Sequence, residues 1–262
     1  MAGDLEGKRA LVCGSTKGIG RACAIEFARR GAEVVIAARD EAALEALRKE
    51  LPAPGGQAHT WVAADFKDSA ALAAKVEGAL SARGPIHVLL NNTGGPPPGP
   101  VLEATVDQFL DAFRQHLFAN HLLARLVVPG MKSARWGRIV NVVSTSVREP
   151  IAGLGVSNTV RAAVAGWAKT LSREVAPFGI TVNNVLPGAT RTDRMTSLMK
   201  TWSEKKGVSV ADYEREVVEK IPAGRMAGPE EIAAAAAFLA SPAAAYVNGV
   251  SLPVDGGRLA GL

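Results

Sequence analysis

The chain has 262 residues, of which 48% are hydrophobic and 21% charged, and a formal net charge of +5 at pH 7. This length and apolar content allow a large buried core, and the ordinary charged fraction excludes a chain that is disordered throughout. A basic chain can bind nucleic acid, but here the basic residues are interspersed with acids, as in Arg48-Lys49-Glu50, and form no long basic run. We therefore expect no nucleic-acid partner.

The cysteines and the apolar stretches indicate the compartment in which the protein is expected. Cys13 and Cys23 lack ligand partners at a useful spacing, so we expect no metal site and a reducing compartment. Residues 1–6 carry acids where a signal peptide carries positive charge. The longest apolar stretch, Ile232 to Ala240, is too short to span a bilayer. The sequence predicts a cytoplasmic protein without a membrane partner.

Apolar runs of strand length alternate with helical patterns from one end of the chain to the other. In chain order we predict strand Arg9–Cys13, helix Ile19–Arg30, strand Glu33–Ala37, helix Glu41–Leu51, strand Gln57–Ala63, helix Ser69–Ala82, strand His87–Asn91, helix Gln108–Met131, strand Arg138–Val143, helix Val156–Ala176, strand Ile180–Leu186 and strand Ser251–Val254. Continuous Val/Ile/Leu runs joined by helical crossovers are typical of a parallel sheet covered on both faces. The sequence thus predicts an α/β fold, a single-domain, doubly wound, Rossmann-type parallel sheet over residues 1–262.

Two stretches depart from this alternation. Gly94-Gly95-Pro96-Pro97-Pro98-Gly99-Pro100 is a stiff loop after the fourth strand, at the sheet edge where open α/β folds bind ligands. A rigid surface turn and a loop that shapes a substrate pocket both fit it. The second stretch, at about 190–223, is irregular, and we predict a mobile helical flap over the site.

The first turn between a strand and a helix carries the sequence Cys13-Gly14-Ser15-Thr16-Lys17-Gly18-Ile19-Gly20. Glycines permit a sharp turn there and let backbone N–H groups approach a pyrophosphate at the positive end of the helix. A glycine cluster alone is weak evidence, but this one lies where dinucleotide binding requires it. We predict that the cofactor contacts Gly14, Ser15, Lys17, Gly18, Ile19 and Gly20.

The end of the second strand indicates which dinucleotide binds. An NAD site usually offers a carboxylate there to the ribose 2′-hydroxyl. This chain instead has Ala38 and Arg39, and the planar fork of arginine suits a 2′-phosphate. Lys17 adds a second cation facing the same phosphate. Both cations could also be solvated surface charges, but together they predict NADP(H).

Further motifs cover essentially the whole chain and give it a family resemblance. They are the glycine spacing, Asn91-Asn92-Thr93-Gly94, Pro187-Gly188 followed by Thr192, and Val254-Asp255-Gly256-Gly257. Together they resemble the short-chain dehydrogenase/reductase family, above all the branch that contains 3-oxoacyl-(acyl carrier protein) reductases. The resemblance implies that Asp65 and Phe66 contact the adenine, that Asn92, Thr93 and Gly94 line the adenosine side, and that the nicotinamide carboxamide is held by Pro187, Gly188 and Thr192. It also implies a homotetramer or homodimer.

The resemblance implies four catalytic positions, of which this chain keeps one. The family uses a tyrosine as general acid–base, a lysine four residues later, a serine thirteen residues earlier and an asparagine on the preceding long helix. Ser144 matches the serine, but Ser157 stands at the tyrosine, Arg161 at the lysine and His116 at the asparagine.

These substitutions leave two functions open. Arg161 can keep the ribose contact and the positive charge, and a water between Ser144 and Ser157 could deliver a proton. His116 suits proton exchange near neutrality, yet a histidine in a helix-packing hydrogen bond fits equally well. The sequence favours an NADP(H)-dependent oxidoreductase that interconverts a carbonyl and an alcohol of a small molecule. The alternative is a non-catalytic NADP(H)-binding protein, a sensor or an assembly partner.

Overall fold

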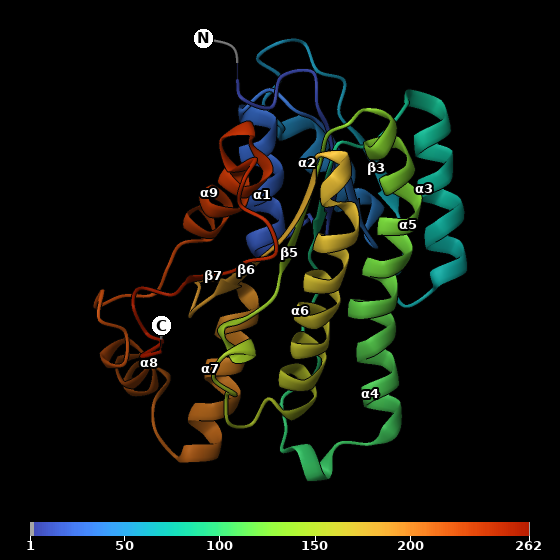
Figure 1. The fold of residues 1–262 in the computed structure, drawn as a ribbon. Coiled ribbons are helices and arrows are strands. Elements are labelled where there is room, and N and C mark those ends of the chain that lie inside the picture. Colours follow the sequence, from blue (N-terminus) through green and yellow to red (C-terminus); the bar gives the residue numbers. More distant parts are fainter. Residues whose placement is uncertain (1–2, 262) are drawn as a thin grey trace.

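The computed structural model describes residues 3–261, and its centre is a seven-stranded sheet in the order β3-β2-β1-β4-β5-β6-β7 (Figure 1). Every neighbouring pair of strands is parallel. The strands are β1 (Arg9–Cys13), β2 (Glu33–Ala38), β3 (Thr60–Ala63), β4 (Val88–Asn91), β5 (Gly137–Val142), β6 (Ile180–Pro187) and β7 (Ser251–Val254). The predicted doubly wound parallel sheet is confirmed.

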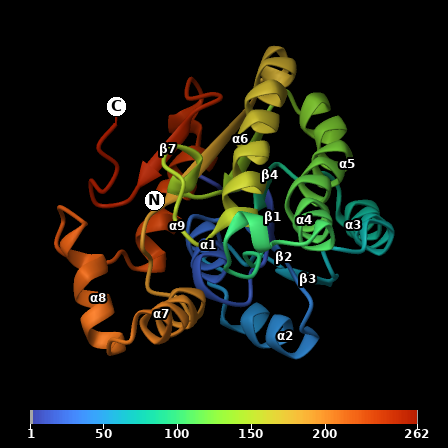
Figure 2. The same cartoon turned by 90° about the horizontal axis from the view of Figure 1, so that it is seen from below.

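Helices cover both faces of the sheet, as Figures 1 and 2 show from two directions. They are α1 (Gly18–Arg29), α2 (Glu41–Glu50), α3 (Ser69–Arg83), α4 (Val106–Phe113), α5 (Ala119–Ser133), α6 (Gly155–Val175), α7 (Asp193–Lys206), α8 (Val210–Glu219) and α9 (Pro229–Ala240). Most predicted bounds are met to within one residue. Helix α9 contains the apolar stretch from Ile232 to Ala240, and no described helix is long and apolar enough to cross a membrane.

Alternation along the buried strands divides the core into two layers. Val12 of β1 faces the layer formed with α1, α2 and α9, whereas its neighbours Leu11 and Cys13 face the layer formed with α3, α5 and α6. Successive side chains of a strand point to opposite faces, so both faces of the sheet must be covered by apolar helix surfaces. This packing fixes the carboxyl ends of the strands, from which the functional loops project.

Two predicted strands begin later than expected, and a histidine explains each. The strand predicted from Gln57 begins at Thr60, and the one predicted from His87 begins at Val88. The Nδ1 atom of His59 accepts a hydrogen bond from the Val34 backbone N–H at 3.0 Å, and that of His87 accepts one from the Arg9 N–H at 3.1 Å. In each case an imidazole ring takes the N–H group that a longer neighbouring strand would have paired.

The long helix predicted over Gln108–Met131 is interrupted. It starts at Val106, behind a capping box formed by Thr105 and Gln108, and continues into α5 through a π-helical turn over Arg114–Phe118. A π turn holds one residue more than an α turn, so it shifts the direction of the side chains it carries. The pattern of apolar residues did not indicate this turn, which contains His116.

The segment predicted as a flap consists of α7 and α8, which project beyond the sheet (Figure 1). A small apolar cluster around Met199, Ile221 and Met226 joins these helices, separate from the two main core layers. The movement of this segment stays a prediction.

Candidate functional site

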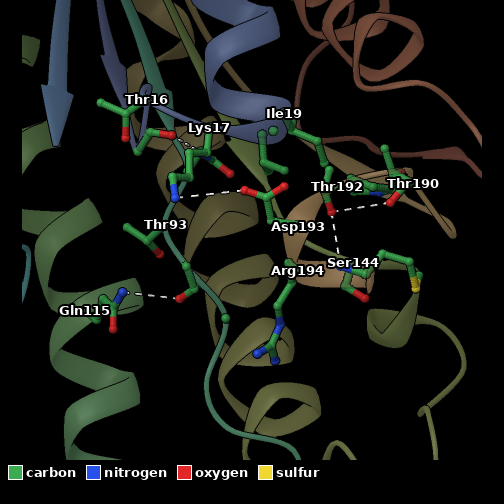
Figure 3. Close-up of a pocket in the computed structure, with 18 of the residues that line it drawn as sticks. Thr16, Lys17, Ile19, Thr93, Gln115, Ser144, Thr190, Thr192, Asp193 and Arg194 are labelled. Carbon is green, nitrogen blue, oxygen red and sulfur yellow. Dashed lines mark hydrogen bonds and ion pairs between the residues drawn. The ribbon is translucent and has the colours of Figure 1, made fainter. Parts of the chain in front are cut away.

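A cavity of about 590 Å³ lies at the carboxyl ends of the strands (Figure 3). Its walls come from the residues that follow β1, β2, β3, β4, β5 and β6 and from the start of α7. The strand order reverses between β1 and β4, and open α/β sheets bind ligands in the crevice at such a reversal. The proline-rich loop after β4 contributes Gly94 and Gly95 to the wall.

The loop between β1 and α1 has room only for glycine at two positions. Gly14 has a φ of 58°, and a Cβ atom there would lie 2.6 Å from the Asn92 carbonyl oxygen. A Cβ atom on Gly20 would overlap the carbonyl oxygen of Gly14. Ser15 is fully buried, and its Oγ donates to the Ala37 carbonyl oxygen at 3.3 Å. The loop is therefore pressed between the ends of β2 and β4.

The amino end of α1 opens on the cavity. The helix begins at Gly18, and the Lys17 side chain before it makes no capping hydrogen bond. No acidic residue lies in the first turn, so its free N–H groups and the positive end of the helix dipole are available to an anion. Gly18 has a φ of 51° and lies opposite Thr192, whose Cγ2 would be 3.1 Å from a Cβ atom.

The two predicted phosphate ligands both border the cavity. Arg39 is exposed at the end of β2. Lys17 Nζ lies 3.9 Å from Asp193 Oδ2, an exposed pair marked in Figure 3. Because exposed ion pairs contribute at most about 1 kcal/mol, this contact does little to hold Lys17 in place.

The residues expected at the two ends of a dinucleotide also lie in the wall. Phe66 is buried and Asp65 exposed beside it, while Asn92 Nδ2 donates to the Gly14 carbonyl oxygen at 3.1 Å. At the other end Gly188 is packed so closely that a Cβ atom would lie 2.7 Å from Asp255 Cα. Thr192 Oγ1 caps α7 by accepting from the Met195 N–H at 3.2 Å.

Ser144 follows β5 and presents its hydroxyl to the cavity (Figure 3). Its Oγ accepts a hydrogen bond from the Ser146 N–H at 3.0 Å. A hydroxyl that accepts one bond keeps its own hydrogen for donation, so Ser144 can polarise a carbonyl oxygen. Ser157, on α6, lines the same cavity and is 8% exposed.

Arg161 lies one helical turn after Ser157 on the same face of α6. Its Nη1 donates to the Val142 carbonyl oxygen at 2.9 Å. Burial, together with the charge of Arg194, lowers the pKa of Arg161 to about 10. The guanidinium is therefore still a cation at neutral pH, and it borders the cavity.

His116 lies behind the wall of the cavity rather than in it. The side chain is 2% exposed, and its Nδ1 lies 2.6 Å from Thr93 Oγ1, while its buried Nε2 has no partner within residues 3–261. Burial and the charges of Arg161 and Arg194 lower the pKa of His116 well below 6.5. The ring is thus neutral at neutral pH, and Thr93 separates it from the cavity.

The predicted site residues therefore converge on one cavity. All of them line it except Ser15, Gly20 and His116. Sequence reasoning missed Gln115 and Arg194, which also line it. Arg194 lies two residues after Thr192, so its place at the start of the flap was the available signal.

Neither tyrosine of the chain lines the cavity. Tyr213 packs against Trp202 in the flap, with ring centroids 6.1 Å apart, and Tyr246 is fully exposed. Burial raises the pKa of the Cys13 and Cys23 thiols, so both stay protonated and are poor nucleophiles.

Known proteins resemble this chain over nearly its full length. Residues 14–258 match the family model described as enoyl-(acyl carrier protein) reductase. The 3-oxoacyl-[acyl-carrier-protein] reductase FabG of Vibrio harveyi is 35% identical over 254 residues, which is 97% of this chain and 98% of that protein.

Solved structures agree with these sequence matches. L-sorbose reductase from Gluconobacter frateurii, complexed with NADPH and L-sorbose, has a TM-score of 0.93, 32% identity and full coverage of both chains. The 3-ketoacyl-(acyl-carrier-protein) reductase from Brucella melitensis, complexed with NADH, has a TM-score of 0.85 and 34% identity, covering 97% of this chain and 99% of that one. This chain therefore belongs to the short-chain dehydrogenase/reductase family.

Proposed function

We propose that the protein is an NADP(H)-dependent oxidoreductase that interconverts a carbonyl and an alcohol of a small molecule. The observation that carries the proposal is that one cavity joins the glycine loop at the start of α1 to the hydroxyl of Ser144. Relatives named for carbonyl reduction, and solved with NADPH or NADH, support the same reaction class.

The residues present fit a nicotinamide dinucleotide. The glycine loop would hold the pyrophosphate, because Gly14 and Gly18 bring backbone to the cavity where the free N–H groups of α1 begin. Arg39, with Lys17 beside it, would hold a 2′-phosphate, which supports NADP(H) over NAD(H). When bound, the nicotinamide supplies or accepts the hydride.

The substrate end would act through Ser144 and Arg161. The free hydroxyl hydrogen of Ser144 donates to the carbonyl oxygen, and so stabilises the negative charge that develops there during reduction. Arg161 stands at the position of the family lysine and would hold the nicotinamide ribose with the donors that do not bind the Val142 carbonyl oxygen.

We infer an atypical proton route, because Ser157 stands at the position of the family tyrosine. An aliphatic hydroxyl is a poorer acid than a phenol, so a water held between Ser144 and Ser157 would deliver the proton to the alkoxide. Thr93, in the wall of the cavity, is hydrogen-bonded to His116 behind it, and this pair would extend the route. A positioned acid–base is worth about 10²–10⁴-fold in rate, so we expect a slow enzyme.

A second candidate is a non-catalytic NADP(H)-binding protein. Among the described residues, no side chain in the wall near Ser144 titrates near neutrality, and this favours the non-catalytic candidate. Ser157 has an aliphatic hydroxyl, Arg161 is a cation at neutral pH, and His116 lies outside the wall.

We also propose self-association into a homotetramer or homodimer. Large apolar side chains are exposed on the segment that runs from the proline-rich loop into α4 and the π turn, namely Val101, Leu102, Val106, Leu110 and Phe118. Apolar side chains gathered in this way are typical of a surface that another chain covers.

The function is tested by titrating NADPH and NADH into the protein by fluorescence, then adding keto-acyl thioesters, enoyl thioesters, quinones and small ketones while following nicotinamide absorbance. We expect tight NADPH binding and slow turnover of at least one carbonyl compound. Arg39→Gln should weaken NADPH binding about 10- to 100-fold and leave NADH binding unchanged. Tight binding without turnover across the panel would establish the non-catalytic alternative, and equal affinity for NADPH and NADH would refute our account of Arg39.

A further inference from the structure

Among the described residues, the negatively charged side chains of the cavity wall lie in one part of it, and a second part carries only positive charge. Its carboxylates, Asp40, Asp65 and Asp193, all lie on the segments that surround the glycine loop, and Asp193 is paired with Lys17 there. The part of the wall around Ser144 contains the cations Arg161 and Arg194 and no carboxylate of residues 3–261. A ligand that reaches Ser144 therefore enters a region of positive charge.

Backbone groups, rather than a carboxylate, hold the side chain of Arg194 in place. Its Nη2 donates to the Pro96 carbonyl oxygen at 2.5 Å, and no carboxylate of the described residues lies within 4.0 Å of it. The guanidinium rests on Gly95, where a Cβ atom would lie 3.3 Å from Nη2 and 3.4 Å from Nε. Gly95 and Pro96 of the proline-rich loop thus hold the guanidinium of Arg194 in place.

The direction of Arg194 separates it from the cofactor end. In Figure 3 its side chain points down, away from Lys17 and Asp193, and Ser144 lies to the right of it. The side chain remains exposed, and one hydrogen bond leaves most of its five N–H donors free. It is therefore open to a ligand in the cavity.

The pKa values of two groups respond to this uncompensated charge. Burial and, after it, the charge of Arg194 lower the pKa of Arg161, and burial and, after it, both guanidiniums lower the pKa of His116. Two like charges that face one space repel each other, and an anion placed between them would relieve that repulsion. Arg161 contributes to this field, whereas Arg194 keeps four of its five N–H donors free for a carboxylate.

We propose that the substrate is a keto acid, or its hydroxy acid, whose carboxylate is held by Arg194 while its carbonyl oxygen meets Ser144. This assignment rests on the proposed function. It gives the glycine-and-proline loop a role: the loop presents Pro96 and Gly95 to Arg194, and so sets the cation at a fixed place beside the reacting carbonyl.

The test measures dead-end complexes, in which no turnover interferes. The NADP⁺-loaded protein is titrated by calorimetry with acetoacetate and with 4-oxopentanoate, and each is compared with its methyl ester. We expect the acids to bind at least about 10-fold more tightly than the esters, because a charge-assisted hydrogen bond contributes about that factor or more. Equal binding of acid and ester to the parent protein would overturn the proposal.

Three variants locate the effect. Arg194→Met should abolish the preference for the acids, and Arg194→Lys should keep part of it, because the charge remains and the fork is lost. Lys200→Met, an exposed cation on the same helix, is the matched control for net charge and should keep the preference. If Arg194→Met instead weakens NADP⁺ binding and leaves the acid-to-ester ratio unchanged, the guanidinium serves a cofactor phosphate and the proposal fails.

The outcome is distinguishable from that of the proposed function. Acid preference without turnover of any keto acid or of any other carbonyl compound in the panel would support the anion site while refuting the enzyme. Turnover of neutral ketones without acid preference would support the enzyme while refuting the anion site.

Discussion

The two ends of the cavity are built in different ways. At the cofactor end the glycine loop, β2 and β4 are in such close contact that single Cβ atoms would collide with backbone oxygens. At the substrate end the guanidiniums of Arg161 and Arg194 lack carboxylate partners among the described residues. Cations that no carboxylate neutralises attract an anion, so a negatively charged ligand is expected at this end. The cofactor end is therefore closely packed without a cofactor, whereas the substrate end carries positive charge that a ligand would neutralise.

The largest expected effect concerns the substrate end. Ser157→Tyr combined with Arg161→Lys should raise kcat about 10²–10⁴-fold, because it places a phenol and a lysine at the family positions on one face of α6. The measurement is steady-state turnover of the best substrate from the panel, with Arg161→Lys alone as the control. No gain in the double variant would mean that the proton route does not limit the parent.

A smaller effect is expected when the close contact at the cofactor end is disturbed. Gly20→Ala should weaken NADPH binding on the order of 100-fold, because the new methyl group would displace the Gly14 carbonyl oxygen and with it the loop. Gly78→Ala is the matched control: its Cβ atom would meet nothing within 4 Å, and in helix α3 it should add up to about 1 kcal/mol of stability. Fluorescence titration after a check of thermal unfolding measures both, and equal affinity of the two variants would contradict the packing described for the loop.

The smallest expected effect is on stability rather than binding. The folded protein lowers the pKa of His116, so below pH 6.5 the unfolded chain binds a proton that the folded chain does not. The free energy of unfolding of the parent should therefore fall as the pH drops from 6.5, by at most about 1.4 kcal/mol per pH unit for this group.

The replacement His116→Gln removes that titration. Urea unfolding of both proteins between about pH 5 and 7.5 should show their stabilities diverging only on the acid side, with the parent losing more. A constant difference across this range would show that the folded protein does not hold the ring neutral.

Sequence reasoning reached the sheet and the cofactor end because both depend on local patterns. The periodicity of apolar residues predicted nearly every strand and helix. The glycine loop after β1 was recognised from the spacing of residues that are neighbours in sequence. The π turn was not predictable, since it depends on how α4, α5 and α6 pack together. Arg194 was missed because its significance arises from Pro96 and Arg161, distant in sequence and brought beside it only by the fold.

The histidines that precede β3 and β4, His59 and His87, lie at the amino end of the sheet, opposite the cavity. Each accepts a backbone N–H through Nδ1, which requires that nitrogen to carry no proton. Protonation of His87 would turn its acceptor into a donor facing another donor, and desolvation together with the neighbouring cations Lys8 and Arg9 lowers the pKa of His87 and so opposes it. Acid would therefore loosen the pairing between β1 and β4 from that end, while the strand ends that carry the cavity remain paired.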